Sequence, residues 1–247
     1  MMANQMTELV FIIDRSGSMS GKEKATIQGF NGILDDYNSL NRKAFQNRGC
    51  QTSKLDISEE PNWNHHTGNK VLVTTVLFDH EYDMLHYRRP IQHIKPMTKA
   101  DYVPRGCTAL YDAIGQTIHH IVNGHRHDND AERPSKVLFV IMTDGMENAS
   151  HHYSSEAVKR MIRTETEKYH WEFMFLGANI NAAESAEEIG IAASCAAQFD
   201  ADCDEDVECC MDGMRNLVMR CCEAPQMSLS EQMDDDWRGK LRRNCNK

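Results

Sequence analysis

Short apolar runs alternate with amphipathic segments along this chain, and that alternation limits the available folds more than any other feature. Residues 8–14, 70–79 and 136–143 have the length and composition of buried β-strands. Each is followed, directly or after a hairpin, by a segment whose apolar residues recur every three or four positions, as in a helix. Such an order of elements builds parallel sheets flanked by helices. The sequence therefore predicts an α/β domain with a doubly wound sheet.

The remaining elements complete this plan. Residues 83–94 follow a tight turn and contain Arg89-Pro90, and because proline cannot donate to a central ladder we expect an antiparallel edge strand there. Residues 108–123 form the clearest helix, which Gly124 can close. Further helices are expected over residues 22–45, 155–169, 182–189 and around 207–221, and further strands over residues 171–176 and 196–199.

Two polar segments interrupt or follow this pattern, so we expect one domain over residues 6–222. Residues 46–69 form a polar insertion that is long for a loop, and it can be either a flexible segment or an ordered hairpin that binds a partner. Residues 223–247 form a polar C-terminal tail, which we interpret as solvated.

Charge and composition narrow the function classes. The chain has 27 basic and 37 acidic residues, a net charge of −10, which repels phosphate backbones and argues against a nucleic-acid partner. No run approaches the roughly 18 to 20 apolar residues of a membrane span, and the amino end lacks a signal-peptide pattern. The nine cysteines contain no CxxC pair and are interpreted as free thiols. We therefore expect a cytoplasmic protein without a membrane partner.

Candidate ligands for a cation stand at the ends of three elements. Asp14, Ser16 and Ser18 follow the first strand, Thr108 enters the long helix, and Asp144 follows the strand over residues 136–143. In a doubly wound sheet, ligands bind at the carboxyl ends of the strands where the strand order reverses. If the first strand neighbours the strand that ends before Asp144 at that reversal, all five side chains converge. Hydroxyl and carboxylate oxygens suit Mg²⁺, so the sequence predicts a magnesium site.

The charge balance of these ligands indicates a kind of partner. The hydroxyl groups of Ser16, Ser18 and Thr108 bring no negative charge. An ion that they bind directly stays electron-poor if the two carboxylates act through water. A vacant position on that ion then favours an anionic oxygen from outside. We expect that oxygen to come from an aspartate or glutamate of a protein partner.

The three segments together resemble a known site. DRSGS at residues 14–18, GCT at 106–108 and TDG at 143–145 are similar, in this order and between these elements, to the metal-ion-dependent adhesion site of von Willebrand factor type A domains. The resemblance covers residues 6–222. It implies a mostly parallel six-stranded sheet with one antiparallel edge strand, helices on both faces, and Mg²⁺ or Mn²⁺. It also implies protein binding rather than catalysis.

The resemblance assigns roles by position. It implies that Ser16, Ser18 and Thr108 bind the metal directly, and that Asp14 and Asp144 act behind them or as switching ligands. Among the neighbouring polar residues, Asp112 is expected to pair with a nearby donor and Asp79 to belong to a hairpin turn. Exposed histidines that could contact a partner or be ordinary surface residues are His80, His151 and His152, while His65 and His66 in the insertion are expected to be inert.

Two other functions stay open. A single Mg²⁺ could assist phosphoryl transfer or hydrolysis in an enzyme. The chain lacks GxxxxGK[ST], GxGxxG after a strand, and GxSxG, which argues against that class. A scaffold in a stress-response system, of the tellurite-resistance kind, is the third alternative.

Overall fold

A single six-stranded sheet forms the centre of the protein. The computed structural model describes residues 5–47, 69–129, 132–200, 204–233 and 237. The strand order is β3-β2-β1-β4-β5-β6, and β3 alone is antiparallel to its neighbour. This confirms the predicted mostly parallel sheet with one antiparallel edge strand. The strands are β1 (Gln5–Asp14), β2 (Asn69–Phe78), β3 (Tyr82–Pro90), β4 (Lys136–Thr143), β5 (Glu172–Ala178) and β6 (Ala196–Phe199).

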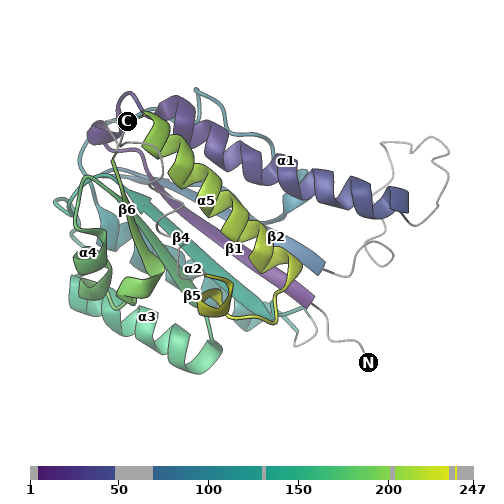
Figure 1. Cartoon of the computed structure of the whole chain (residues 1–247). Coiled ribbons are helices and arrows are strands. Elements are labelled where there is room, and N and C mark those ends of the chain that lie inside the picture. The colour runs from purple at the N-terminus through teal and green to yellow at the C-terminus, as the bar shows by residue number, and fades with distance from the viewer. Residues whose placement is uncertain (1–4, 48–68, 130–131, 201–203, 234–236, 238–247) are drawn as a thin grey trace.

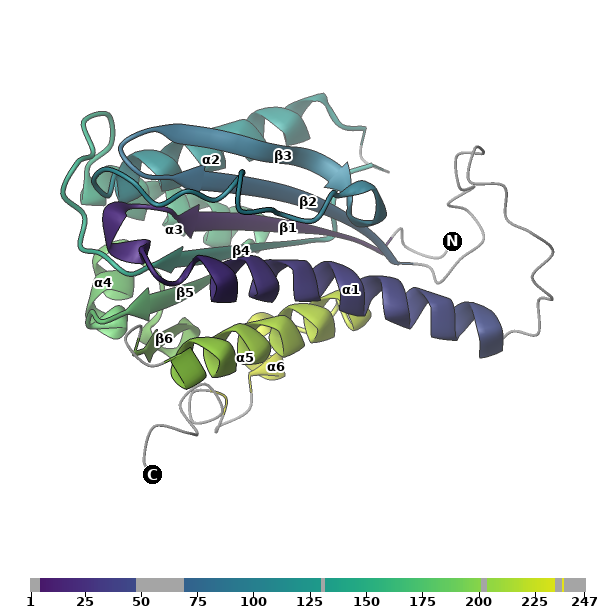
Figure 2. The ribbon, with the colours of Figure 1, turned by 90° about the horizontal axis from the view of Figure 1, so that it is seen from above.

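Helices cover both faces of the sheet. Figure 2 shows α1 and α5 on one face and α2 and α3 on the other, with the short α6 beside α5. This is the three-layer arrangement that alternating strands and helices build. The helices are α1 (Glu23–Asn47), α2 (Leu110–His127), α3 (Ser155–Tyr169), α4 (Ala182–Glu188), α5 (Asp204–Glu223) and α6 (Leu229–Gln232).

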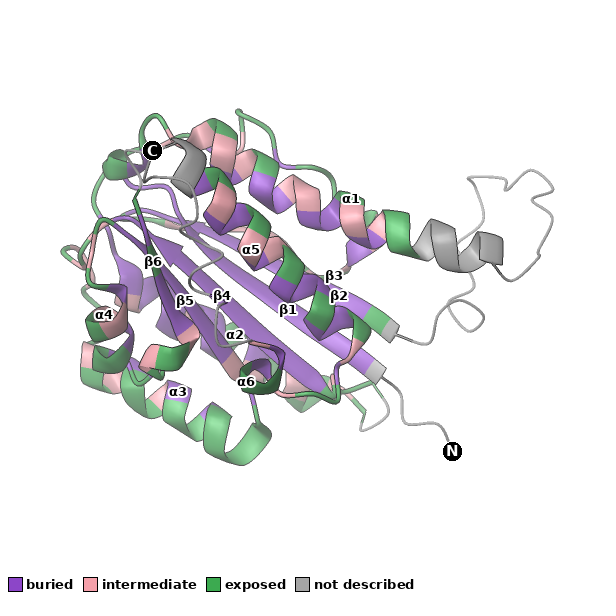
Figure 3. Cartoon of the chain, in the orientation of Figure 1, coloured by how far each residue is buried: buried purple, intermediate pink, exposed green. Residues whose placement is uncertain are grey.

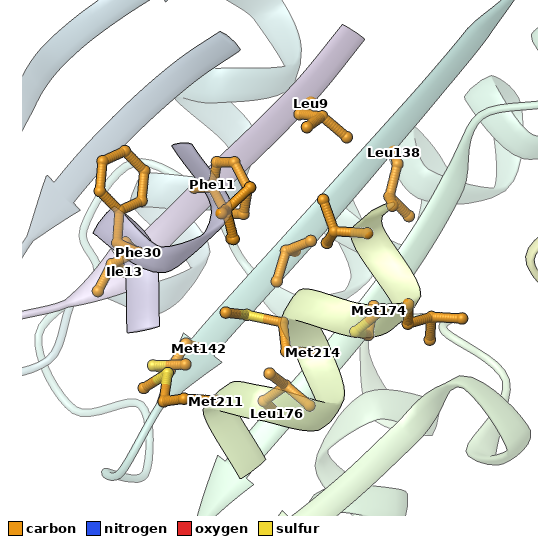
Figure 4. Close-up of a cluster of buried hydrophobic side chains, with 14 of the residues drawn as sticks. Leu9, Phe11, Ile13, Phe30, Leu138, Met142, Met174, Leu176, Met211 and Met214 are labelled. Carbon is orange, nitrogen blue, oxygen red and sulfur yellow. The ribbon is translucent and has the colours of Figure 1, made fainter. Parts of the chain in front are cut away.

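The core consists of two apolar layers, one on each side of the sheet. Successive side chains of a strand point to opposite faces, so Phe11 of β1 packs under α1 and α5 while Ile12 packs under α2 and α3. In the first layer Met211 and Met214 of α5 lie over the sheet (Figure 4). The central strands β1 and β4 are buried on both faces (Figure 3), as expected for inner parallel strands.

Two glycines let α1 and α5 approach each other closely. A Cβ atom at Gly29 would lie 2.5 Å from the Met211 sulfur, and one at Gly32 would lie 2.6 Å from a guanidinium nitrogen of Arg215. A larger residue at Gly29 would meet the Met211 side chain as far as its Cβ, at 2.8 Å, whereas at Gly32 the flexible Arg215 side chain can turn aside. The close approach of the two helices therefore depends most on the absence of a side chain at Gly29.

Several boundaries differ from the sequence predictions. The expectation that Gly124 closes the long helix is wrong, because α2 continues to His127. Gly124 instead gives room to the edge strand, since a Cβ there would lie 2.7 Å from the Tyr87 hydroxyl. The helix α6 is not predicted from the sequence, although Leu229 is buried against the core. Most of the insertion at residues 46–69 lies outside the described residues.

Within residues 5–47, 69–129, 132–200 and 204–233, no helix combines the length and the apolar character that crossing a bilayer requires.

Candidate metal centre

The sheet brings the two candidate carboxylates to one edge. β1 and β4 are parallel neighbours with Ile13 opposite Met142, so Asp14 and Asp144 leave the sheet side by side. The chain turns from β1 to β2 on one side and reaches β4 on the other, so the strand order reverses between them. Ligand sites of open α/β sheets lie at such a reversal. The predicted neighbour relation of these two strands is confirmed.

Asp14 is fully buried, and the protein holds both of its carboxylate oxygens. The Ser16 backbone N–H donates to Oδ1 over 2.6 Å, and the Thr143 hydroxyl donates to Oδ2 over 2.6 Å. Burial raises the pKa of Asp14 to about 6, although these hydrogen bonds act in the opposite direction. Asp144 contributes a smaller repulsion to the same shift. A positive charge nearby would therefore stabilise the ionised form of the Asp14 carboxylate.

The two serine hydroxyls are spaced as neighbouring ligands of a small cation. Ser16 Oγ lies 3.0 Å from Ser18 Oγ, and Ser18 Oγ donates to Asp144 Oδ1 over 2.6 Å. Adjacent oxygens of an octahedral Mg²⁺ shell with ligands at about 2.1 Å are about 3 Å apart. Ser16 is buried and Ser18 is exposed, so the pair runs from the interior to the surface.

Thr108 reaches the same edge through a loop that is fastened to the first strand. Tyr102 donates its hydroxyl hydrogen to the Asp14 carbonyl over 2.5 Å. Two backbone hydrogen bonds join the loops, from Arg105 N–H to the Arg15 carbonyl (2.8 Å) and from Gly17 N–H to the Gly106 carbonyl (3.1 Å). These three bonds fix where the loop ends and α2 begins, and so they place Thr108.

The hydroxyls of Thr108 and Ser18 both lie close to Gly145. A Cβ atom at Gly145 would lie 2.9 Å from Thr108 Oγ1 and 3.5 Å from Ser18 Oγ. Thr108 and Ser18 thus flank a space that a single methyl group would enter, and hydrogen bonds link the other candidate ligands to Ser18 or to its loop. A donor set of three hydroxyls and two carboxylates, with this spacing, fits a hard divalent cation.

Lys22 is a cationic neighbour that the sequence patterns did not reveal. Its ammonium nitrogen lies 2.5 Å from Asp144 Oδ2 and 2.7 Å from the Ser18 carbonyl oxygen. The Lys22 side chain is 12% exposed and the Asp144 side chain 1%, so the pair is largely withdrawn from water. Both oxygens of Asp144 therefore have partners within the site.

Asp79 organises the turn beside the site rather than forming part of it. Its carboxylate accepts from Arg15 Nε and Arg105 Nε, each over 3.0 Å, and from the Glu81 N–H over 2.7 Å. Burial acts to raise the pKa of Asp79, but these donors hold it below its usual value. The interpretation of Asp79 as a hairpin-turn residue is confirmed.

Asp112 also positions a loop. It accepts hydrogen bonds from three successive N–H groups, those of His151, His152 and Tyr153, over 2.8–2.9 Å. The expectation that Asp112 pairs with nearby donors is confirmed. Glu147 of the same loop accepts a hydrogen bond from the Tyr111 N–H over 3.0 Å. This bond also holds the loop after β4 against the start of α2.

The thiols and histidines contribute little to this centre. In the part of the chain that the structure describes, no group of three or more His, Cys, Asp or Glu side chains could hold a metal ion. His80, His151 and His152 are exposed near the loops of the site. His65 and His66 lie outside the described residues.

Comparisons with known proteins identify the fold. No protein-family model matches the sequence, and a search of the curated proteins found no significant match. Among solved structures, a von Willebrand factor type A protein from Catenulispora acidiphila aligns over 87% of this chain and 43% of its own, with 12% identity and a TM-score of 0.52. This chain therefore spans less than half the length of that protein.

Two further structures are similar at lower scores. Proximal thread matrix protein 1 from the mussel byssus, solved with a zinc-occupied adhesion-site motif, covers 87% of this chain and 46% of its own, with 14% identity and a TM-score of 0.48. The manganese-loaded TRAP protein of Plasmodium vivax covers 71% and 58%, with 17% identity and a TM-score of 0.42. The strand order, the helices on both faces and the Catenulispora alignment agree, and this chain has the von Willebrand factor type A fold.

Proposed function

We propose that this domain is a protein-binding module that depends on a divalent metal ion. Ser16, Ser18 and Thr108 hold Mg²⁺ or Mn²⁺ directly, and Asp14 and Asp144 support it from behind. The carboxylate of an aspartate or glutamate on a partner protein completes the coordination of the ion. The convergence of three hydroxyls and two carboxylates at the carboxyl edge of β1 and β4 carries this proposal.

The chemistry of the site supports an acidic partner. Bound there, the ion supplies positive charge among ligands that are mostly neutral. Asp14 stays committed to the Ser16 N–H and to Thr143, so it positions the first loop and balances charge. Asp144 is likewise held through Ser18. A carboxylate from another molecule then becomes the strongest ligand with access to the ion.

An enzymatic role has less support from the same contacts. The Ser16 and Ser18 hydroxyls bond to each other and to Asp144. In the described ranges, neither has a hydrogen bond to a histidine that could serve as a base. A cytoplasmic location forms part of the proposal, and the thiols of Cys107 and Cys221, which form no disulfide, support it.

Titration calorimetry with Mg²⁺ and Mn²⁺ tests the metal site. The wild-type protein should bind one ion, and Thr108→Ala should weaken binding by at least about tenfold, or ~1.4 kcal/mol. Thr164→Ala, an exposed substitution on α3, serves as the matched control and should bind as the wild type does. The absence of any uptake by the wild type would overturn the proposal.

Partner capture tests the second part of the proposal, the metal-dependent binding of an acidic protein partner. Wild-type protein and Ser16→Ala are used as baits in Mg²⁺ and in EDTA, and a partner should be held only by the wild type in Mg²⁺. Replacing acidic residues of that partner one at a time should abolish binding at a single position. A partner that binds equally well in EDTA would show that the interface does not use the ion.

A further inference from the structure

Lys22 has an unusual place for a lysine. Lysine side chains are rarely withdrawn from water unless they are paired. Here the side chain turns back over the loop between β1 and α1, and its ammonium group donates to Asp144 Oδ2 and to the Ser18 carbonyl. Both acceptors belong to residues of the candidate metal centre. The neighbouring Lys24, by contrast, is exposed.

The ammonium group and a divalent ion draw on the same negative charge. Asp144 Oδ1 accepts from Ser18, whose hydroxyl is a candidate metal ligand, while Oδ2 accepts from Lys22. An ion beside Ser18 therefore lies next to a carboxylate whose negative charge the Lys22 ammonium group already compensates. Two cations at one carboxylate also repel each other, and the low exposure of the pair leaves little water to screen that repulsion.

We propose that Lys22 is a built-in counter-ion that competes with the divalent metal for Asp144 and so lowers the metal affinity of the site. This inference rests on the proposed function. It adds that the chain itself sets the metal concentration at which the site fills. When the ion binds, the ammonium group loses its hold on Asp144 and becomes more accessible at the rim.

A purely structural role for Lys22 predicts a different outcome. The contact with the Ser18 carbonyl could serve only to hold the loop in shape. Removing the ammonium group would then loosen the hydroxyl ligands and weaken metal binding. The two roles are therefore separated by the sign of the change in affinity.

The test compares metal affinity in three variants. Lys22→Met keeps the aliphatic stem without the charge, Lys22→Arg keeps the charge, and Lys24→Met removes the same charge from an exposed position close by. Calorimetric titration with Mn²⁺ should show Lys22→Met binding about tenfold more tightly than the wild type, which is ~1.4 kcal/mol. Lys24→Met and Lys22→Arg should stay near the wild-type value.

Other outcomes overturn the inference or the function beneath it. Weaker or unchanged Mn²⁺ binding by Lys22→Met overturns the counter-ion role and leaves the metal site intact. Equal gains in Mn²⁺ affinity in Lys22→Met and Lys24→Met would show that the net charge of the chain causes the effect, and would overturn the competition at Asp144. Failure of both the wild type and Lys22→Met to bind Mn²⁺ or Mg²⁺ removes the proposed function as well.

A second measurement needs no variant. Acylation of Lys22 in the wild-type protein, followed by mass spectrometry of its peptide, reports how accessible the ammonium group is. Mn²⁺ should speed Lys22 acylation relative to EDTA, while Lys24 should react at the same rate in both. Equal protection of Lys22 with and without Mn²⁺ would contradict displacement.

Discussion

At the scale of single residues, Asp14 shows how the site works against the stability of the fold. Its carboxylate is buried, and burial raises its pKa from 3.8 to about 6. Between these two values the native state binds more protons than the unfolded state does. Stability therefore falls as the pH rises through this window, because the native state must then hold an unfavourable buried charge.

We expect this cost to appear as a pH-dependent difference between the wild type and Asp14→Asn. In EDTA, the wild type should lose about 2 kcal/mol of unfolding free energy relative to the variant between about pH 4 and pH 7. The asparagine amide can donate to the Thr143 hydroxyl, which can turn to the Gly145 carbonyl at 3.1 Å. Urea denaturation at several pH values measures the difference, and parallel curves would contradict it.

Gly145→Ala should close the space between the hydroxyl ligands. The new Cβ would lie 2.9 Å from Thr108 Oγ1, so that hydroxyl must move away from its present position. The backbone at Gly145 does not have a positive φ, so alanine is tolerated there. Mn²⁺ affinity should fall by at least about tenfold, or ~1.4 kcal/mol. Circular dichroism should show an unchanged fold, and undiminished Mn²⁺ binding would show that the ion lies elsewhere.

At the scale of elements, the start of α2 holds the loop that follows β4. Asp112→Ala leaves three N–H groups of that loop, at His151, His152 and Tyr153, without their acceptor. We expect a loss of about 2–3 kcal/mol in unfolding free energy, measured by urea denaturation. Asp112→Asn retains one acceptor oxygen and should lose less. Equal stability of wild type and Asp112→Ala would mean that water replaces the carboxylate without cost.

The elements with strong local signals were predicted well. β4 and α3 begin and end at the predicted residues, because each is a continuous apolar run or a regular amphipathic stripe. The end of α2 was missed, since the role of Gly124 depends on Tyr87, which lies on the edge strand. α6 was missed because a four-residue helix carries too few positions to show a period.

The residues of the candidate site also fall into those that the sequence predicts and those that it does not. The candidate ligands were found from their positions at strand and helix ends, and the structure brings them together. Tyr102, Asn148 and Lys22 were missed. Tyr102 holds the Asp14 carbonyl, and Asn148 accepts from the Thr108 N–H over 3.0 Å. Each of these three residues contacts a site residue that is distant in the sequence, so no spacing in the chain indicates the contact.

At the scale of the whole molecule, metal binding should stabilise the native fold. An ion that binds only the folded chain adds about 2.7 kcal/mol at a free concentration 100-fold above its Kd. For a chain of 247 residues, we expect Mg²⁺ or Mn²⁺ to raise the Tm by about 5–10 °C. Scanning calorimetry with and without EDTA measures the shift. Thr108→Ala should show little of it, and an equal shift in that variant would indicate binding at another place.

The position of the site within the sheet has a mechanical consequence. Asp14 and Asp144 leave from β1 and β4, which are inner strands with β2 and β5 paired on their outer sides. A pull exerted by the proposed partner would enter the sheet along these strands. To extract either one, many ladder bonds must shear together, whereas an edge strand can be peeled off one bond at a time. The proposed site therefore lies at the end of the two strands that the sheet holds from both sides.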